Sequence, residues 1–364
     1  MSTMVELEAV KKDTAIGLFV SDSTPSKVLS SNKSSLVLSY FAFACMYGIN
    51  FFMFSPTDVD WDNNTVDGVF LKDGEFVRLK TPLPAFVFWR WGNPLDKKFN
   101  AMKKRLKKSC YQVYRYWNDK NKFTSWLLQG KYADYAIETR AYEDGAVNDF
   151  LARHNSMILK PIFGQKGKGI YKVEKQGKDT VMVSYLEDKK EMKLEDFIAQ
   201  NHDTFTKNQY TLQPFVDSTT LEGAPMDIRL CMARGAHGEW CATALYFRFG
   251  GVGNVTTNTI LSTRSRSPYV LQGLSHQLGK KEGRRLYNEI LNIQKNFPEY
   301  YQNNNKECKN FIIPEIALDI GIDRNNGNQL KFFEVGFTPG SAGIDRALLA
   351  STNMQFFKYL MSRG

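Results

Sequence analysis

Short apolar runs alternate with polar turn sequences along the first hundred residues. An apolar piece of helix length, at about 34–47, stands between the first two runs, so the predicted order there is strand, helix, strand. The alternation predicts an α/β sub-domain with a mostly parallel sheet over residues 15–118, after an N-terminal tail at 1–14. The predicted strands are Ile16–Val20, Phe51–Phe54, Val69–Leu71, Phe76–Leu79 and the run PLPAFVFWRW at 82–91.

One stretch within this region approaches the length of a membrane span. Leu36–Phe54 runs for 19 residues without a charge, and a transmembrane helix needs about 20 apolar residues. Gly48 and Asn50 divide the stretch into a helix-length piece and a short aromatic strand, and Tyr40 is polar. The sequence therefore predicts no membrane span here.

Residues 95–113 have the pattern of a basic amphipathic helix. Apolar residues recur at 95, 99, 102, 106 and 113, and lysine and arginine fill the other faces. Cations beside aromatic residues can bind single-stranded nucleic acid, so nucleic-acid binding stays open as an alternative role for this helix. A solvated face opposite an apolar stripe is favoured. The aromatic residues that follow are Tyr111, Tyr114, Tyr116 and Trp117.

The rest of the chain predicts mostly antiparallel strands, and the chain as a whole an α+β fold. Residues 156–175 read as strand, glycine loop and strand, and 210–216 form a strand that ends at Asp217. Two alternating strands follow, then a helix near 281–296. The last two strands, PEIALDIGID and QLKFFEVGF, are joined by a turn at 325–328. The predicted boundaries are a linker and start of the second unit at 119–155, a glycine-loop lid at 156–216 and a C-terminal unit at 217–364.

Net charge and cysteine content limit the kinds of partner and of metal or disulfide site that the protein can have. The formal net charge of +10 favours anionic partners such as nucleotides, acidic peptides or nucleic acid, without choosing among them. The five cysteines are odd in number and never form CxxC, which argues against a disulfide framework or a zinc knuckle. The start of the chain carries acids and no signal-peptide pattern. These features predict a cytoplasmic protein.

The segment LKPIFGQKGKGI at 159–170 predicts a glycine hairpin that can approach phosphate. It is not a Walker A loop, because Gly169 is followed by a strand-like sequence and not by a helix. The same fact excludes a dinucleotide fingerprint. Backbone N–H groups and the charges of Lys160, Lys166 and Lys168 suit phosphate oxygens. A surface turn without function is the alternative.

Two acids and two arginines lie on the predicted C-terminal strands. The turn at 325–328 should bring Asp319 and Glu334 side by side, and two converging carboxylates suit Mg²⁺. Arg229 and Arg248 lie among apolar neighbours, so each must be paired or face an anion. The alternatives are solvated strand-end acids and a structural ion pair between Arg229 and Asp227.

The order of these features resembles the ATP-grasp superfamily, and more narrowly its YheC/YheD-like branch, which is named for spore-coat-associated proteins. The resemblance implies an ATP-grasp fold with an N-terminal α/β sub-domain, a mobile lid and a C-terminal antiparallel sheet, with ATP held between two lobes. The segments that carry it are AIGLFVS, NKF at 121–123, MILKPIFGQKGKGIYKV, TLQPFVD, MDIRL, LYFRFGGVGNVTTN, IALDIGID and FFEVGFTPGS.

By this resemblance most of the nucleotide contacts come from the lid and the strand that follows it. Lys160 would contact the phosphates on the adenine side, Lys122 would be an earlier nucleotide-binding lysine, and Asp217 a ribose contact. The glycine loop over the β- and γ-phosphates would consist of Gly164, Gln165, Gly167, Lys168 and Gly169. The hinge that reads adenine through its backbone would be Gln213, Pro214, Phe215 and Val216.

The resemblance also implies the chemistry. Arg229 and Arg248 would be catalytic, binding the γ-phosphate and the anionic intermediate, while Asp319 and Glu334 would hold one or two Mg²⁺ ions. A substrate carboxylate would attack the γ-phosphate of ATP to give an acyl phosphate and ADP, and an amine or another nucleophile would then attack the acyl phosphate. Positioning and charge neutralisation suffice for such a transfer. The resemblance places Asn258 near the substrate, and Arg90 and Ser341 are further candidate substrate contacts. Arg264 and Arg266 lie in a segment that departs from the family pattern and could hold an acidic substrate or peptide, with a flexible basic loop as the alternative.

Two departures from the family pattern leave rival hypotheses open. The usual Glu-x-Asn is here Glu334-Val335-Gly336, which removes a third metal ligand, so a water, Asp323 or nothing takes its place. The segment 259–266 replaces the usual Gly-Gly after Asn258. The leading hypothesis is an ATP- and Mg²⁺-dependent carboxylate–amine ligase acting on an amino acid, a peptide or a small, possibly acidic, carboxylate. The rivals are an ATP-grasp phosphotransferase and a non-catalytic structural protein that binds nucleotide or polyanion. Association with a spore coat is implied by the resemblance alone.

Overall fold

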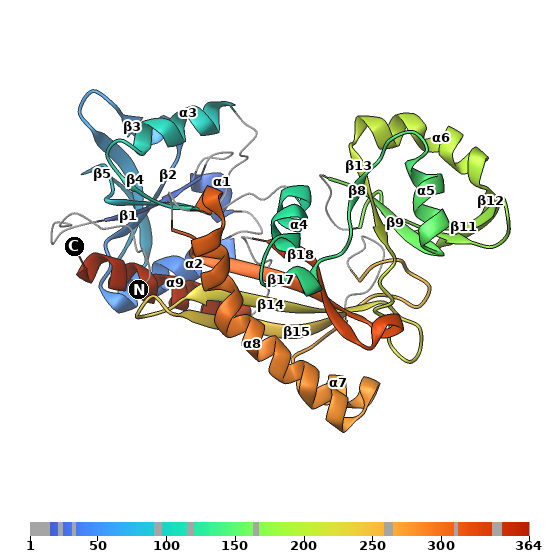
Figure 1. Ribbon diagram of the computed structural model, residues 1–364. Helices are drawn as coiled ribbons and strands as arrows, with labels where there is room; N and C mark the ends of the chain where they lie inside the picture. The colour runs from blue at the N-terminus through green and yellow to red at the C-terminus, as the bar shows by residue number, and fades with distance from the viewer. Residues whose placement is uncertain are drawn as a thin grey trace.

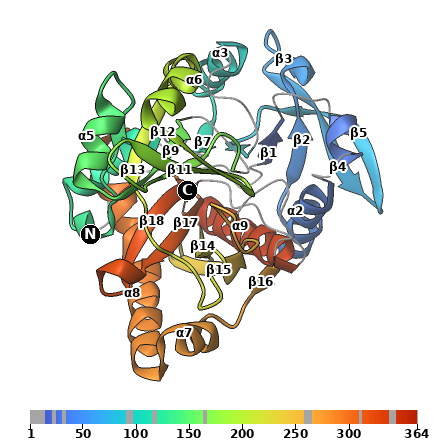
Figure 2. The same ribbon diagram turned by 90° about the vertical axis from the view of Figure 1, so that its right-hand side faces the viewer.

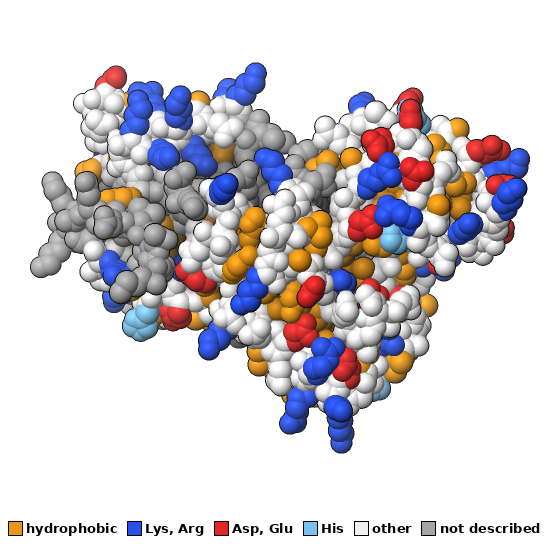
Figure 3. Space-filling view, viewed as in Figure 1, with side chains coloured by type: hydrophobic (Ala, Val, Ile, Leu, Met, Phe, Trp, Pro, Cys, Tyr) orange, Lys and Arg blue, Asp and Glu red, His pale blue; other side chains and the backbone are white. Residues whose placement is uncertain are grey.

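The computed structural model describes residues 15–20, 25–30, 34–90, 97–114, 120–162, 167–257, 265–308, 312–336 and 344–363. Three sheets organise the chain into an N-terminal lobe, a lid lobe and a C-terminal lobe, drawn as ribbons in Figure 1 and from the same side as a space-filling view in Figure 3. The mixture of helices with several sheets confirms the predicted α+β class.

The sheet of the N-terminal lobe has the order β3-β4-β2-β1-β6-β7, with β5 paired to β4. β1, β2, β6 and β7 are parallel, and the segment β3 to β5 is antiparallel. The strands are β1 (Ile16–Phe19), β2 (Phe51–Phe54), β3 (Val59–Asp60), β4 (Thr65–Lys72), β5 (Glu75–Pro82), β6 (Phe86–Trp89) and β7 (Tyr111–Tyr114). The helices are α1 (Pro25–Leu29), α2 (Ser34–Tyr47), η1 (Pro56–Asp58) and α3 (Lys97–Leu106).

The apolar stretch that approaches the length of a membrane span is divided as predicted. α2 ends at Tyr47 and the buried strand β2 begins at Phe51, so the chain reverses within the stretch. Among the described helices, none combines the length and the apolar character that crossing a bilayer requires.

The lid lobe is an antiparallel sheet covered on one face by two helices. α4 (Lys120–Leu128) and η2 (Ala133–Tyr135) precede it. Its order is β12-β11-β10-β9-β13-β8, and α5 (Ala146–Arg153) and α6 (Leu194–Lys207) share a core with residues such as Leu159 and Val173. The strands are β8 (Arg140–Ala141), β9 (Ser156–Pro161), β10 (Tyr171–Lys175), β11 (Thr180–Tyr185), β12 (Asp188–Lys193) and β13 (Tyr210–Pro214).

The sheet of the C-terminal lobe has the order β16-β15-β14-β17-β18 and is antiparallel. Figure 2 shows it beside the lid sheet, with α7 and α8 below. The strands are β14 (Met226–Arg234), β15 (Trp240–Phe249), β16 (Ser265–Ser267), β17 (Glu315–Asp323) and β18 (Gln329–Gly336). The helices are α7 (Val270–Leu278), α8 (Lys280–Asn304), η3 (Lys306–Cys308), η4 (Arg324–Asn326) and α9 (Ile344–Ser362).

Two of these helices differ from the sequence prediction. α8 extends well beyond the predicted 281–296, and α9 has no counterpart among the predicted elements. α9 packs against α2, and its residues Ala350, Met354 and Phe357 belong to the same core as the N-terminal sheet. It also contacts β14 and β15, so it joins the N-terminal lobe to the C-terminal sheet.

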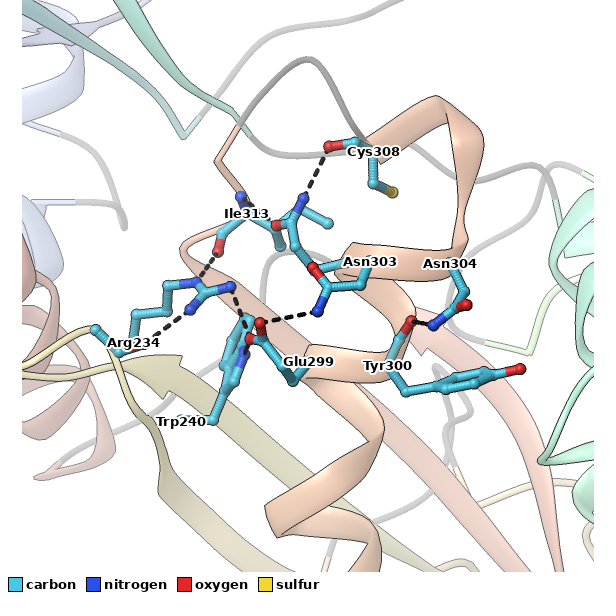
Figure 4. A network of polar contacts seen from close by, with 10 residues as sticks. Arg234, Trp240, Glu299, Tyr300, Asn303, Asn304, Cys308 and Ile313 are labelled. Atoms are coloured by element: carbon cyan, nitrogen blue, oxygen red, sulfur yellow. Dashed lines mark hydrogen bonds and ion pairs between the residues drawn. The ribbon is translucent and has the colours of Figure 1, made fainter. Parts of the chain in front are cut away.

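A buried arginine fixes α8 to the hairpin of β14 and β15 (Figure 4). The guanidinium of Arg234 donates to the backbone oxygens of Gly238, at 2.8 Å, and Ile313, at 3.3 Å, and lies 3.2 Å from a carboxylate oxygen of Glu299. It also stacks on Trp240, 4.6 Å from the ring centroid, and Trp240 Nε1 donates to the same carboxylate. Each of these partners is fixed in the fold, which indicates a structural role.

Candidate nucleotide and metal site

The C-terminal sheet has one apolar and one charged face. Side chains alternate between the faces of a strand, and on one face residues such as Ile228, Leu230 and Leu318 form a core with α7 and α8. The cross-strand pairs on the other face are Asp227 with Arg248, Arg229 with Asp319, and Asp319 with Glu334. The predicted catalytic and metal-binding residues therefore lie together on one surface, drawn from four neighbouring strands.

Ion pairs connect four members of this surface. Asp319 lies 2.7 Å from Arg229 Nε and 2.8 Å from a terminal nitrogen of Arg248, and the Arg248 guanidinium also donates to both oxygens of Asp227, at 2.5 and 2.7 Å. Thr257 Oγ1 donates to Asp227 as well. The ion pair considered from the sequence, Arg229 with Asp227, is thus replaced by Arg229 with Asp319 and Arg248 with Asp227.

Burial shapes the ionisation of the network. It raises the pKa of Asp227, and the positive charge and hydrogen bonds of Arg248 oppose that rise. Burial also disfavours the charge of Arg248, but Asp319 and Asp227 outweigh it and hold the pKa of Arg248 above its usual range. The arginines therefore stay cationic on a surface where they can face an anion.

Asp319 and Glu334 offer two hard oxygen ligands for a divalent cation. Their Cα atoms are register partners on β17 and β18, and Glu334 is exposed. The described residues contain no group of three or more acids, histidines or cysteines that could hold a metal. Asp319 and Glu334 together could hold a Mg²⁺ ion by two carboxylates, with further positions left to water and phosphate oxygens.

Gly336 occupies the position of the missing third ligand. It is two residues beyond Glu334 on the same face, and among the described residues nothing lies within 4 Å of a Cβ added there. Asp323 does not take over this role, because Gly336 pairs with Ala317, whereas Asp323 lies on the other side of Asp319, about 13 Å along β17.

A β-bulge adds an aromatic ring to the charged face, which the sequence did not predict. The register between β17 and β18 shifts at Asp319 and Ile320, and Phe333 is the extra residue. The ring of Phe333 lies 2.1 Å from the position that a Cβ of Gly321 would occupy, so only glycine fits beneath it. Phe333 therefore supplies a flat apolar surface beside Asp319 and Glu334. A side chain's face cannot be assigned across a bulge by alternation, so no sequence signal indicated it.

The lid sheet has its own polar face. Ile158 pairs with both Lys172 and Gln213, which places them on the same face as Lys160, opposite the core beneath α5 and α6. Lys172 Nζ lies 3.9 Å from the ring centroid of Phe215 and 2.9 Å from Glu174. Lys172 was not among the predicted site residues, because in sequence it is an ordinary strand lysine.

The described part of the glycine loop requires glycine. Gly167 and Gly169 have φ values of 70° and 73°, a region that favours glycine. A Cβ at Gly169 would lie 2.5 Å from the Tyr210 hydroxyl oxygen. Lys168 between them is exposed. Gly164 and Gln165 lie outside the described residues.

The hinge connects the lid to the C-terminal lobe through backbone hydrogen bonds. Phe215 N donates to Ser156 O at 3.2 Å, and Arg324 N donates to Asp217 O at 3.1 Å. The carboxylate of Asp217 accepts a bond from Thr219 Oγ1 at 2.8 Å. In the strand that leads to the hinge, Gln213 Nε2 donates to Thr139 Oγ1 at 2.7 Å, and Pro214 and Val216 are half-buried.

Two predicted cations belong neither to the lid sheet nor to the C-terminal sheet. Lys122 is exposed on α4, whose residues Phe123 and Leu127 enter the core that α8 helps to form. Arg90 follows β6, is 3% exposed and forms an ion pair with Glu315, which also accepts a bond from Asn353 Nδ2 at 3.1 Å. The structure thus places Arg90 in a buried contact between lobes, and its assignment as a substrate contact stays a prediction.

The remaining substrate candidates belong to two segments. Asn258, Arg264 and Ser341 lie outside the described residues. The backbone of Arg266 is part of β16, where its Cα is the register partner of Arg248.

A lid sheet hinged to a second antiparallel sheet with this charged face defines an ATP-grasp protein. Two solved structures share the fold. They are the D-alanine–D-alanine ligase of Bacillus anthracis complexed with ATP (TM-score 0.51, 9% identity, 96% of this chain and 98% of that one) and D-alanyl-alanine synthetase A of Vibrio cholerae (0.50, 12%, 97% and 98%).

The sequence comparison gives the family. Residues 110–363 match the YheC/D like ATP-grasp family, so the chain belongs to it, as the sequence resemblance predicted. The endospore coat-associated protein YheD of Bacillus subtilis (strain 168) is 21% identical over 327 residues, covering 86% of this chain and 68% of YheD. The endospore coat-associated protein YheC of the same organism is 26% identical over 219 residues, covering 59% of this chain and 57% of YheC.

Proposed function

We propose that the chain binds Mg²⁺-ATP between the lid sheet and the C-terminal sheet and uses it to activate a substrate carboxylate for attack by an amine. The observation that carries this proposal is the charged face, where two arginines and two carboxylates occupy adjacent register positions on β14, β15, β17 and β18. Anions and hard cations are the ligands that such a face suits.

The nucleotide would occupy the space between the two polar faces. Lys160 and Lys172 share a face of the lid sheet with Gln213, and their charges would neutralise phosphate oxygens. The ring of Phe333 would support the base or ribose from the C-terminal side, and the backbone from Gln213 to Val216 would read the adenine edge. The B. anthracis ligase, which has the same fold, was solved in complex with ATP, and this supports ATP as the nucleotide.

The ion pairs of Asp319 explain how the site would respond to its ligands. Arg229 and Arg248 both hold Asp319, so a phosphoryl group that binds the guanidiniums would release the carboxylate. Bound Mg²⁺ would then neutralise phosphate charge against Asp319 and Glu334. Exchanging one anion for another keeps both arginines paired throughout.

The chemistry needs no side-chain nucleophile. A carboxylate oxygen of the substrate forms a bond to the γ-phosphorus as the bond to the β-phosphate oxygen breaks, which gives an acyl phosphate and ADP. The amine nitrogen then bonds to the acyl carbon, inorganic phosphate leaves, and the amine proton passes to solvent. Arg229 and Arg248 would stabilise the charge that develops on the phosphoryl and acyl oxygens.

A phosphotransferase is the second candidate, and Gly336 favours it. Without the third ligand, Asp319 and Glu334 would hold a second Mg²⁺ ion more weakly than the family's Glu-x-Asn site does. A weaker metal site would suit a single phosphoryl transfer to an acceptor, without a later ligation step. The products separate the two activities, since a ligase releases inorganic phosphate and a kinase retains the phosphoryl group on its acceptor. The names of the B. subtilis relatives add endospore coat association as a location to test.

The experiment is release of ADP and phosphate from Mg²⁺-ATP in the presence of pooled amino acids and peptides. We expect release that requires the pool and is lost in Glu334→Gln and Lys160→Ala. The matched controls are Glu191→Gln and Lys190→Ala on β12, where both side chains are exposed. Nucleotide binding without turnover, together with salt-sensitive binding of a polyanion, would instead support the non-catalytic hypothesis.

A further inference from the structure

The guanidinium of Arg248 has two carboxylate partners, which hold it in different ways. It donates to both oxygens of Asp227, from Nε at 2.5 Å and from Nη2 at 2.7 Å. The contact with Asp319 runs through Nη2, at 2.8 Å. Two parallel bonds fix both the plane and the rotation of a guanidinium, whereas a contact through one nitrogen does not. Asp227 therefore sets the orientation of Arg248.

Asp227 is itself fixed by the fold. It is the register partner of Arg248 on β14 and β15, it is buried, and it accepts a further bond from Thr257 Oγ1. Thr257 reaches it because the chain at 256–257 passes close to Gly250, where a Cβ would lie 2.7 Å from the Thr256 backbone oxygen and 3.3 Å from the Cα of Thr257. The carboxylate is thus held by the neighbouring strand on one side and by this loop on the other.

The other edge of the Arg248 guanidinium is the one that can meet an anion. Nη1 donates to no residue in the described part of the chain, and it is not among the buried polar atoms that lack a partner, so it keeps accessible surface. Asp227 occupies the edge formed by Nε and Nη2. An anion must then bind at the edge formed by Nη1 and the second N–H of Nη2, where Asp319 already lies.

We propose that Asp227 is a positioning residue of the proposed ligase and that Thr257 supports it. Asp227 stays bonded to Arg248 while Asp319 gives way to the phosphoryl group, so the guanidinium keeps one orientation during the exchange. Removing the partner of a buried charge is strongly unfavourable, which keeps Asp227 in place. The inference rests on the proposed function, in which Arg248 binds the phosphoryl group, and it gives the two carboxylates on Arg248 different roles.

NMR of the arginine side chains tests the orientation directly. The protein is labelled with isotopic arginine, and the signals of Arg248 are those lost in Arg248→Lys. We expect separate signals for Nη1 and Nη2 in the parent protein, both without ligand and with Mg²⁺ and a non-hydrolysable ATP analogue. In Asp227→Asn the guanidinium should rotate at least about tenfold faster and the two signals should merge, because the two-point contact is lost. Signals that stay separate in this variant would overturn the inference.

Thr257 provides a milder change that decides the question if Asp227→Asn does not fold. Thr257→Val keeps the shape and the ion pair but removes the donor to Asp227, and Thr257→Ser keeps the donor. We expect Thr257→Val to lower the kcat of ADP release about tenfold with little change in the KM for Mg²⁺-ATP, and Thr257→Ser to restore it. The matched control is Thr352→Val, since this buried threonine bonds to Leu348 O within α9. Equal losses in Thr257→Val and Thr257→Ser, or a change in KM alone, would contradict a positioning role.

The same NMR signals separate this inference from the proposed function. A shift of the Arg248 signals on binding of Mg²⁺ and the analogue is expected if Arg248 contacts the phosphoryl group. If the shift appears but Asp227→Asn and Thr257→Val leave the rotation unchanged, the proposed function stands and the positioning role fails. If no shift appears while Asp227→Asn frees the guanidinium, the phosphoryl contact fails and Asp227 is a structural partner only.

Discussion

β14 presents one arginine to each face of the C-terminal sheet, and the two arginines have different kinds of partner. Arg234, on the α8 face, is bonded to two backbone oxygens and Glu299 and stacked on Trp240. Arg229, on the charged face, is paired with Asp319, which Arg248 shares. Backbone partners cannot be exchanged without unfolding, whereas a shared carboxylate can be exchanged for another anion. The identity of the partners thus separates the structural arginine from the one that we propose to be functional.

The largest expected effect comes from the charged face. We expect Arg248→Met to lower ADP release by about 100-fold or more, because it removes a cation aimed at charge that develops during transfer. Arg234→Met, assayed well below its melting temperature, should retain turnover. Similar losses of turnover in both variants would contradict the assignment of a catalytic role to the charged face and a structural role to the α8 face.

On the α8 face, a substitution should lower the stability of the protein and leave its nucleotide affinity unchanged. Arg234→Met is expected to lower the free energy of unfolding by about 3 kcal/mol, since it leaves half-buried Glu299 and two backbone oxygens without their donor. Urea unfolding followed by tryptophan fluorescence measures this loss. Calorimetry should find unchanged affinity for Mg²⁺-ATP, and a parallel loss of nucleotide affinity would contradict the structural role.

Adding a metal ligand at position 336 tests the charged face by a gain of metal binding. Gly336→Asn should raise the apparent affinity for Mg²⁺ by about tenfold, because the new oxygen would lie beside Glu334 at a position that no described residue fills. The Mg²⁺ dependence of ADP release or nucleotide binding measures the change. Gly327→Asn, in the exposed turn before β18, is the control. An equal increase in Mg²⁺ affinity in that variant would contradict the prediction.

The smallest expected effect is a pH dependence on the α8 face. Burial opposes the charge of Glu299, but Arg234, Asn303 and Trp240 outweigh it and lower the pKa of Glu299. A lowered folded-state pKa gives stability that is complete above the unfolded value, about 4.3, and is lost as the pH falls through the folded value. The difference in unfolding free energy between the parent and Arg234→Met should therefore be constant from about pH 7 to 5 and shrink by up to about 1 kcal/mol below pH 4, because Glu299 is partly exposed. A difference that stays constant throughout would contradict this assignment.

Sequence reasoning located the charged face because residue type and strand alternation determine it. Arg229, Arg248, Asp319 and Glu334 follow from two hairpins with clear turns. Phe333 could not be assigned in this way, since a bulge changes its face. The partners of the arginines were also misassigned, because cross-strand register is a tertiary property.

The helix α9 escaped prediction for a different reason. A surface helix buries one stripe, and the resulting periodicity identifies it in sequence. α9 is enclosed by α2 and the N-terminal sheet as well as by β14 and β15, so its apolar residues are distributed around its circumference. The described residues that show this are Leu349, Ala350, Met354, Phe356, Phe357 and Leu360.

The position of α9 sets the order in which the lobes can mature during synthesis. The N-terminal lobe leaves the ribosome first, yet Tyr47 bonds to Ser351, 304 residues later, and the core over α2 contains Met354 and Phe357. The N-terminal lobe is thus translated before the other two lobes but is completed only when α9 has been made. Until then the apolar surface that α9 covers is exposed to solvent or must be bound by a chaperone. A nascent chain arrested at Gly336 should bind a hydrophobic dye or a chaperone through that surface, and a chain extended past Ser362 should not.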